Sequence, residues 1–303
     1  LVLGNGQLAQ IVKARGPNMQ TNAACAGATQ AVALAYDMIQ VGRAERVIVI
    51  AGDNASSDTL MPWLGNGFRA LGAATKCADV RLAALPFDKR RSGMILGSGG
   101  IGMILESEDG ARRRHALSLG AAGGTDPAAT ARPAFKVRLL ATLVSNSAFH
   151  GAAMDRKHIA SEFERFVRQV ETERGISREE LCREGVYFSH ETCTNASPTS
   201  SCASNELYGL QQVFGEHLKH LLICNTKGFT GHPMGVSFED VVATEVLTTG
   251  MVPPLPNHSE LDPALGVDLK LSRGGAYPCR YAMRFAAGFG SHIALALYEK
   301  NDD

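Results

Sequence analysis

Three residues of the types used in covalent catalysis stand in separate, recognisable settings along this chain of 303 residues. Cys25 lies in Asn-Ala-Ala-Cys-Ala-Gly, His190 in Phe-Ser-His-Glu-Thr, and His232 in Lys-Gly-Phe-Thr-Gly-His. A cysteine thiol forms acyl intermediates readily, and an imidazole exchanges protons or donates hydrogen bonds near neutral pH. One thiol with two imidazoles is the set that an enzyme needs to join carbon atoms of two thioesters.

The surroundings of Cys25 predict a nucleophile held at a sharp turn. Small residues flank it on both sides, and an Ala-rich stretch typical of a buried helix follows. A thiol at the start of a helix faces free N–H groups and the positive end of the helix dipole, so we expect a stabilised thiolate. The alternative is an unreactive buried cysteine, a common fate of this residue type.

Both histidines follow short apolar segments that read as strands. His190 comes after 186–189 and should lie at the carboxyl end of a strand, where α/β sheets bind ligands. Lys227 and His232 are five residues apart around two glycines, which would let the backbone approach a reacting centre while the lysine fixes the orientation or charge of the ring. The alternatives are a hydrogen-bonded loop histidine and an ordinary glycine turn.

The elements that would position these residues alternate between strand and helix. Helices are predicted within 21–44 and over 157–173, 178–183, 204–214 and 237–249. Strands are predicted over 46–52, 93–106 (a pair with 97–100 as its turn), 136–149 in part, 186–189, 221–224, 280–285 and 293–298. The segments 53–85 and 107–135 look irregular, the second as a surface excursion. This order indicates an α/β fold with a mostly parallel sheet.

Charge and hydropathy exclude several kinds of partner. Lysine and arginine total 30, as do aspartate and glutamate, so the net charge is zero with neutral histidines. That balance favours neither nucleic acid nor an anionic membrane surface. The longest strongly apolar stretch, 47–51, is far too short to cross a bilayer, so we expect no membrane span.

The cysteines and glycines give no sign of a metal or cofactor. Seven scattered cysteines without a Cys-x-x-Cys pair favour reduced thiols, and hence a reducing compartment such as the cytoplasm or an organelle interior. Residues 97–102 match Gly-x-Gly-x-x-Gly literally, but a strand-like segment follows where a dinucleotide site needs a helix. We therefore predict neither a cofactor nor a metal site.

Taken in order, these motifs resemble those of the β-ketoacyl synthases (ketosynthases). That family carries a cysteine in a small-residue turn, a His-Gly-Thr-Gly-Thr-like motif and a Lys-x-x-x-x-His motif. The chain presents Cys25, then His190 with Thr192 and Thr194, then Lys227 with His232. The segments 86–93, 96–99, 252–254 and 288–292 resemble four further family motifs, which include a Phe-Asp-x-x-Arg-x-Gly stretch and a C-terminal Gly-Phe-Gly turn.

The resemblance implies a thiolase-like α/β fold, in which two similar halves stack as five layers (αβαβα). Residues 1–185 would form the later part of the first half, which is incomplete, and 186–303 the second half. The family has many more residues before its nucleophile, so we expect this sequence to be part of a longer polypeptide. The family also forms homodimers, with the strand at 46–51 pairing across the twofold axis.

The resemblance implies an acyltransferase mechanism as well. Cys25 would take an acyl chain, with the N–H groups of Cys25 and Phe289 as the oxyanion hole and the Phe289 side chain as a gate. A malonyl thioester on an acyl carrier protein would then lose carbon dioxide. Its carbonyl would be held by His190 and His232 as neutral donors, with Lys227 nearby disfavouring their protonation. The resulting carbanion would attack the acyl group in a decarboxylative Claisen condensation.

Some positions depart from the family pattern. Glu191 and Cys193 stand where glycines are usual, Ser98 replaces the glutamate of Gly-Glu-Gly, and Ser291 replaces a glycine. These departures favour a divergent but active subgroup, nearer to multienzymes of polyketide or polyunsaturated-lipid synthesis than to free-standing fatty acid synthases. The basic cluster 112–115 is expected in a solvated loop, with contact to a carrier protein as the alternative.

Two other functions stay open. A non-catalytic ketosynthase-like interaction or scaffold domain would explain the altered motifs, but it has no need of Cys25, His190, Lys227 and His232 together. A thiolase would need a second catalytic cysteine, and Cys279 lies outside the expected glycine-rich loop.

Overall fold

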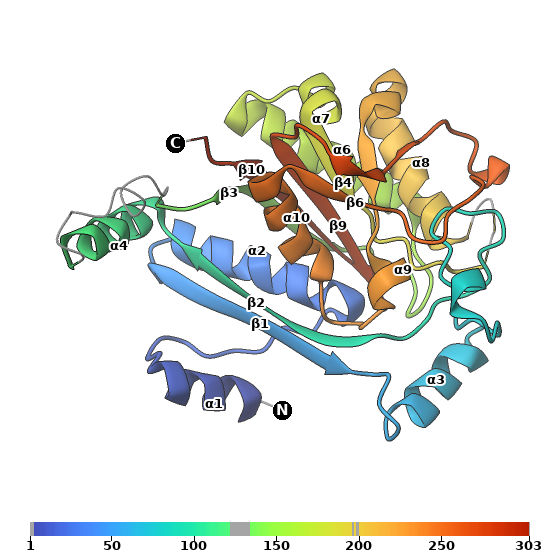
Figure 1. Cartoon of the computed structure of the whole chain (residues 1–303), viewed down its shortest axis with the longest axis horizontal. Helices are drawn as coiled ribbons and strands as arrows, with labels where there is room; N and C mark the ends of the chain where they lie inside the picture. Colours follow the sequence, from blue (N-terminus) through green and yellow to red (C-terminus); the bar gives the residue numbers. More distant parts are fainter. Residues whose placement is uncertain (1–2, 122–133, 196, 198–199, 303) are drawn as a thin grey trace.

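A mixed six-stranded sheet forms the centre of the structure, a computed structural model that describes residues 3–121, 134–195, 197 and 200–302. Its strands follow the order β3-β10-β9-β4-β5-β7 (Figure 1). They are β3 (Val137–Asn146), β4 (Gly185–Phe188), β5 (Leu222–Cys224), β7 (Lys270–Leu271), β9 (Tyr281–Gly288) and β10 (His292–Lys300).

Strand direction divides this sheet into two parts. Strands β4, β5, β7 and β9 run parallel, whereas β10 lies antiparallel to both β3 and β9. Three of the five pairings are parallel, so the expectation of a mostly parallel sheet holds for the large sheet, and β10 is the strand that departs from it. The strands β9 and β10 are joined by residues 289–291 alone, and so short a connection permits only an antiparallel pair.

Helices cover both faces of the sheet because its strands alternate apolar side chains between the two faces. Tyr187 of β4 packs into the apolar cluster on one face, and its neighbours Val186 and Phe188 pack into the cluster on the other. The helices are α6 (Arg156–Arg174), α7 (Arg178–Glu184) and α8 (Cys202–Phe214) on the first face, and α2 (Gly27–Gln40) and α10 (Phe238–Thr249) on the second.

A two-stranded sheet lies on the far side of α2 from the large sheet (Figure 1). It consists of β1 (Arg46–Asn54) and β2 (Ser98–Glu106), paired antiparallel with Arg46 opposite Glu106. The predicted strand pair within 93–106 is wrong, because this segment forms one strand whose partner is β1. Helices and sheets thus alternate through the molecule as layers.

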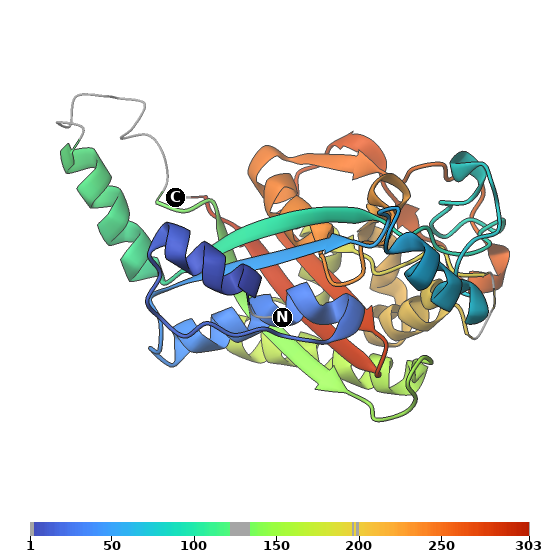
Figure 2. The same cartoon turned by 90° about the horizontal axis from the view of Figure 1, so that it is seen from below.

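Two helices fall where the sequence suggested irregular structure. They are α3 (Met61–Ala70) within 53–85 and α4 (Glu108–Ala121) within 107–135. The second extends away from the rest of the molecule (Figure 2), so it is an excursion, but a helical one. The remaining elements are α1 (Leu3–Val12), α9 (Lys227–Thr230), β6 (Met251–Pro254), β8 (Arg273–Ala276) and the short 3-10 helices Ala24–Ala26, Val80–Leu82, Gly215–His220 and Pro263–Leu265.

Two further predictions concern the chain as a whole. The division at residue 185 stays a prediction; β3 precedes it and β4 follows it, and both belong to the large sheet. Over the residues described, every helix is too short or too polar to traverse a lipid bilayer.

Candidate active site

Cys25 lies in a tight turn at the start of α2, as the sequence predicted. A single 3-10 turn, Ala24–Ala26, leads directly into the helix, and Ala24 has a φ of 46°, in the left-handed region. The end of β9 passes against this turn. A Cβ on Gly288 would lie 2.3 Å from the carbonyl oxygen of Ala23 and 2.9 Å from the backbone nitrogen of Cys25. Only glycine allows that approach.

The thiol itself is buried, with 9% of Cys25 exposed. Burial raises the pKa of the thiol to about 11, while the charge of Lys227 and the N–H groups of Cys25 and Phe289 act in the opposite direction. The expectation of a stabilised thiolate is therefore wrong, because the pKa of the thiol is raised and not lowered. The cost of removing the thiolate from water outweighs the effects of the helix terminus and of the nearby charge. The two N–H groups named in the predicted oxyanion hole do face the sulfur.

His190 follows the end of β4, and its backbone is fixed by a buried carboxylate that the sequence did not reveal. The N–H of His190 donates to Oε1 of Glu206 at 2.9 Å, and the hydroxyl of Ser189 donates to Oε2 at 2.9 Å. The hydroxyl of Tyr187 donates to Oε1 at 2.5 Å. Burial raises the pKa of Glu206, and these donors act against the rise. Glu206 on α8 therefore sets the direction in which the His190 loop leaves the sheet.

His232 is held by its backbone against the segment before β2. Its N–H donates to the carbonyl of Ile95 at 2.7 Å, and its carbonyl accepts from the N–H of Gly97 at 3.1 Å. A Cβ on Gly97 would lie 2.2 Å from the carbonyl oxygen of Thr230. The glycines around His232 thus permit close backbone approach, as the motif suggested.

The two histidine rings meet edge to face, with centroids 5.7 Å apart and planes inclined by 80°. Both residues are buried. Burial, and next the charge of Lys227, hold the pKa of His190 well below its ordinary value and lower that of His232 to about 3. Both imidazoles are therefore neutral over the physiological range.

These rings keep unused hydrogen-bonding capacity. Nδ1 of His190 and both ring nitrogens of His232 are buried and have no hydrogen-bond partner among the described residues. Buried polar atoms are nearly always paired, because an unpaired one costs about 1–3 kcal/mol. Their concentration at one place indicates groups kept ready for a ligand.

Lys227 belongs to a buried row of alternating charges. Its Nζ lies 2.5 Å from Oε1 of Glu239, whose Oε2 lies 3.3 Å from Nη2 of Arg284. Although burial opposes it, Arg284 and Lys227 hold the pKa of Glu239 well below its ordinary value. Arg284 also donates to the carbonyls of Phe188 and Ser189 at 3.2 Å each.

Glu206, Glu239 and Arg284 lie outside the motifs that mark the reactive residues in the sequence. One signal for Arg284 was available: it interrupts the apolar run Tyr-Ala-Met-Arg-Phe-Ala-Ala of β9, and charged residues are almost never fully buried without a partner. The two glutamates lie on helices with polar neighbours, where nothing in the sequence marks them as buried.

Phe289 follows β9 and stacks on Phe68 of α3, with ring centroids 5.8 Å apart. Both belong to an apolar cluster with Met94 and Leu96. Cys193 and Ser291, which stand where the resemblance leads us to expect glycine, keep a glycine-like backbone with φ values of 62° and 63°. The replacements therefore alter the side chain and preserve the path of the chain.

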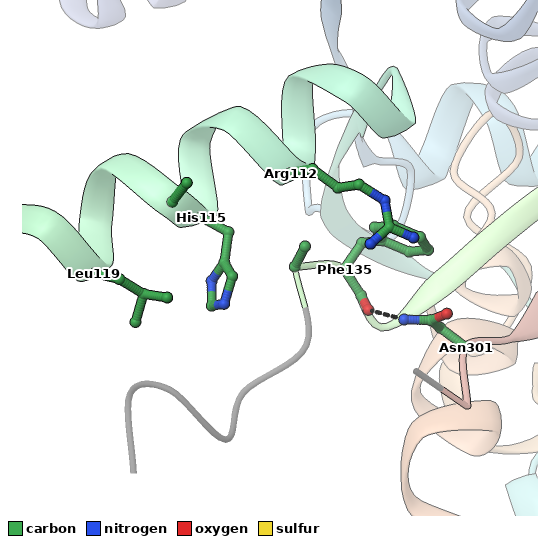
Figure 3. A pocket seen from close by; sticks show the side chains of 7 residues that line it. Arg112, His115, Leu119, Phe135 and Asn301 are labelled. Atoms are coloured by element: carbon green, nitrogen blue, oxygen red, sulfur yellow. Dashed lines mark hydrogen bonds between the residues drawn. The ribbon is translucent and has the colours of Figure 1, made fainter. Parts of the chain in front are cut away.

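A separate concavity of about 350 Å³ lies beside α4 (Figure 3). Its lining includes His115 but none of Cys25, His190 and His232. The basic cluster beside it was expected in a loop but is helical. Its arginines 112, 113 and 114 pair with Glu108, Glu45 and Glu106. Among the described residues, no three histidine, cysteine, aspartate or glutamate side chains gather as a metal site would require, and all seven cysteines are free thiols.

Comparison with known sequences links the chain to condensing enzymes. Residues 3–111 match the family model described as "Beta-ketoacyl synthase, N-terminal domain". Over 304 aligned residues the chain is 26% identical to 3-oxoacyl-[acyl-carrier-protein] synthase 2 of Staphylococcus aureus (strain COL), covering 98% of this chain and 65% of that protein. Nodulation protein E of Rhizobium meliloti is 26% identical, with 97% and 64% covered. The chain therefore spans less than two thirds of the length of these relatives.

Several solved structures with the same fold are described as ketosynthases or β-ketoacyl synthases. A type II polyketide ketosynthase, in complex with its acyl carrier protein and bound to a hexaketide, gives a TM-score of 0.80 at 21% identity, covering 99% of this chain and 67% of that one. A β-ketoacyl synthase of Burkholderia phymatum gives 0.77 at 19% identity, with 98% and 64% covered. A ketosynthase of the bacillaene synthase of Bacillus amyloliquefaciens gives 0.73 at 17%, with 99% and 49% covered. The predicted thiolase-like fold is confirmed.

Proposed function

We propose that the chain is a ketosynthase of the thiolase-like superfamily and that it carries the condensing site of a β-ketoacyl thioester synthase. One observation supports this most directly. Two neutral imidazoles have ring nitrogens with no hydrogen-bond partner in the described part of the chain, and the charge of Lys227 acts on both rings and on the buried thiol of Cys25. Neutral N–H donors suit a carbonyl that becomes an enolate, because they stabilise negative charge without giving up a proton.

In the first half-reaction, the sulfur of Cys25 forms a bond to the carbonyl carbon of an acyl thioester. The bond to the departing thiol breaks, and the proton of Cys25 goes to that leaving group. The N–H groups of Cys25 and Phe289 face the sulfur and would stabilise the oxyanion, by roughly 3 kcal/mol for each donor. Because the pKa of the thiol is about 11, deprotonation must accompany attack.

In the second half-reaction, a malonyl thioester loses carbon dioxide, and the electrons of the broken carbon–carbon bond form an enolate. His190 and His232 donate hydrogen bonds to its oxygen. The carbanion bonds to the acyl carbon, the bond to Cys25 breaks, and the thiolate takes up a proton. Burial, and next the charge of Lys227, which pairs with Glu239 at 2.5 Å, disfavour protonation of both rings.

The acyl and malonyl groups would arrive on an acyl carrier protein, and Phe289, stacked on Phe68, would gate the acyl chain. A homodimer is part of the proposal: among the described residues β1 has a neighbour on one edge only, and Ile48 and Ile50 on it are exposed. We place the domain in a multienzyme of polyketide or fatty acid synthesis, working in a reducing compartment such as the cytoplasm.

Measuring the two half-reactions separately in the complete protein tests this function. Mass spectrometry should find an acyl group on Cys25 after incubation with an acylated carrier protein, and none in Cys25→Ala. Adding malonyl carrier should then release a β-ketoacyl product. His232→Ala should abolish product while leaving acylation within about threefold, because the ring acts on the enolate and not on the first attack.

Two outcomes would contradict these assignments. Absence of an adduct on Cys25 across several acyl chain lengths would favour the non-catalytic scaffold domain. Equal loss of acylation and condensation in His232→Ala would contradict the role given to that ring.

A further inference from the structure

Glu191 occupies a position, directly after His190, where the family usually carries glycine. Its side chain is completely buried. Oε1 accepts a hydrogen bond from the N–H of Cys193 at 3.1 Å and lies 3.6 Å from Nε of Arg91. Within the described part of the chain, neither Oε2 of Glu191 nor that Nε has a hydrogen-bond partner. A carboxylate in such a place is costly, which suggests that the loop depends on it.

Arg91 is fixed independently of Glu191. Its Nη1 donates to the carboxylate of Asp262 at 2.7 Å and to the carbonyl of Asp88 at 3.0 Å. Its Nη2 donates to the hydroxyl of Ser201 at 3.2 Å, at the start of α8. The guanidinium is therefore anchored on three segments before it meets Glu191, and it can act as a rigid reference for that side chain.

The backbone of Glu191 connects to the second catalytic loop. Its carbonyl accepts from Nδ2 of Asn225 at 2.8 Å, and Oδ1 of Asn225 accepts from the N–H of Lys227 at 3.0 Å. On the other side, the carbonyl of Cys193 accepts from the N–H of Gly93 at 2.9 Å. Glu191 thus stands between Arg91 and the loop that carries Lys227.

We propose that Glu191 is a positioning residue for condensation: by pairing with Arg91 and capping Cys193, it holds the His190 loop in register with the Lys227 loop. This inference rests on the proposed function. It predicts that loss of the carboxylate affects the half-reaction that uses both rings and spares the acylation of Cys25.

The pH dependence of the two half-reactions offers a test of this role, because a general loss of packing would not alter it. Burial raises the pKa of Glu191 to about 7, and Arg91 opposes the rise. The other charged or titratable groups around it are Lys227, Glu206, Cys193, Cys202, His190 and, through Arg91, Asp262. The rings of His190 and His232 have much lower pKa values, so they do not change charge near pH 7. The ionised carboxylate of Glu191 pairs with Arg91. The ratio of the condensation rate to the rate of Cys25 acylation should therefore rise as the pH increases through about 7.

The experiment compares wild type with Glu191→Gln in the complete protein, from pH 5.5 to 8.5. Acylation of Cys25 should stay within about twofold, whereas condensation at pH 8 should fall roughly 10- to 100-fold, as expected for a misplaced donor. The rise in the condensation-to-acylation ratio near pH 7 should disappear. Glu191→Asp, which keeps the charge but shortens its reach, should show the same loss of condensation and decides the matter if Glu191→Gln does not fold.

Glu106→Gln is the matched control, because it removes a largely buried carboxylate that pairs with Arg46 and Arg114 on other segments and not with Arg91. Its ratio should stay at the wild-type value. An unchanged ratio in both Glu191 variants, or an equal change in Glu106→Gln, would overturn the inference. Absence of condensation in the wild type would instead contradict the proposed function, so the two failures are distinguishable.

Discussion

The thiol of Cys25 is far from its thiolate form, and Lys227 is the charge that most favours its ionisation. Burial raises the pKa to about 11, and Lys227 is the leading influence in the opposite direction. Removing that charge should raise the pKa further. This couples the lysine to the nucleophile as well as to the rings, although its ammonium pairs directly with Glu239.

Lys227→Met should therefore slow alkylation of Cys25 by iodoacetamide, by roughly three- to tenfold at pH 8.5, because less thiolate is present. Peptide mass spectrometry separates Cys25 from the other cysteines. Cys77, the one cysteine that is not buried, serves as the internal control, and its rate should not change. Faster alkylation of Cys25 in this variant would contradict the electrostatic coupling.

The sequence predicts a set of reactive side chains, but not what holds them. Cys25, His190, Lys227 and His232 each stand in a motif with a local signature, so their types and spacing are informative. Glu206 holds the backbone of His190, and Glu239 pairs with Lys227 and, at 3.3 Å between α10 and β9, with Arg284. Contacts of that kind depend on the fold, and no local pattern encodes them.

At the scale of elements, the fit between β2 and the His232 loop depends on glycine. A Cβ on Gly97 would collide with the carbonyl of Thr230 at 2.2 Å, whereas one on Gly102, within β2, would meet nothing within 4 Å. Backbone atoms cannot move aside as the end of a flexible side chain can. The same substitution should thus cost much more stability at Gly97 than at Gly102, five residues further along the chain.

Gly97→Ala should lower the free energy of unfolding by about 2 kcal/mol or more and reduce condensation, since His232 is displaced. Gly102→Ala should change stability by less than about 1 kcal/mol, in either direction. Urea denaturation of both variants, followed by the condensation assay, checks this. Equal destabilisation would show that the close approach is not decisive.

Elements with strong periodicity were predictable, and those defined by a distant partner were not. The helices α6, α8 and α10 begin and end within two residues of expectation, helped by N-cap side chains at Asp155, Ser201 and Ser237. The sequence predicts a hairpin over 93–106 because the glycines at 97–100 imitate a turn. In the structure β2 lies within this segment and pairs with β1 along its whole length. The helix α4 was hidden by its polar composition.

At the scale of the whole molecule, the outer face of the β1–β2 sheet is unusually apolar. Ile48, Ile50 and Ile104 are 37%, 40% and 68% exposed, and Ile48 lies opposite Ile104 in the register. Contiguous apolar surface of this kind marks an interface, and one edge of β1 is free of neighbours among the described residues. Both features suit the proposed homodimer.

Ile50→Lys should therefore weaken dimerisation of the complete protein by roughly 100-fold, because a charge would be buried at the interface. Sedimentation at several concentrations measures the effect. Leu117→Lys on α4 is the control, since Leu117 is 75% exposed on a different element. Identical behaviour of wild type and Ile50→Lys would place the interface elsewhere.

In the proposed site, the neutrality of the two rings has a consequence for what can bind there. A pocket that captures anions through cationic side chains loses affinity as salt is added, because mobile ions screen the attraction. Uncharged donors give no such long-range field. The affinity of the two rings for an uncharged carbonyl ligand should then vary little with ionic strength. A reversible inhibitor of this site should carry a carbonyl oxygen whose lone pairs point at the ring N–H groups, and it does not need a negative charge.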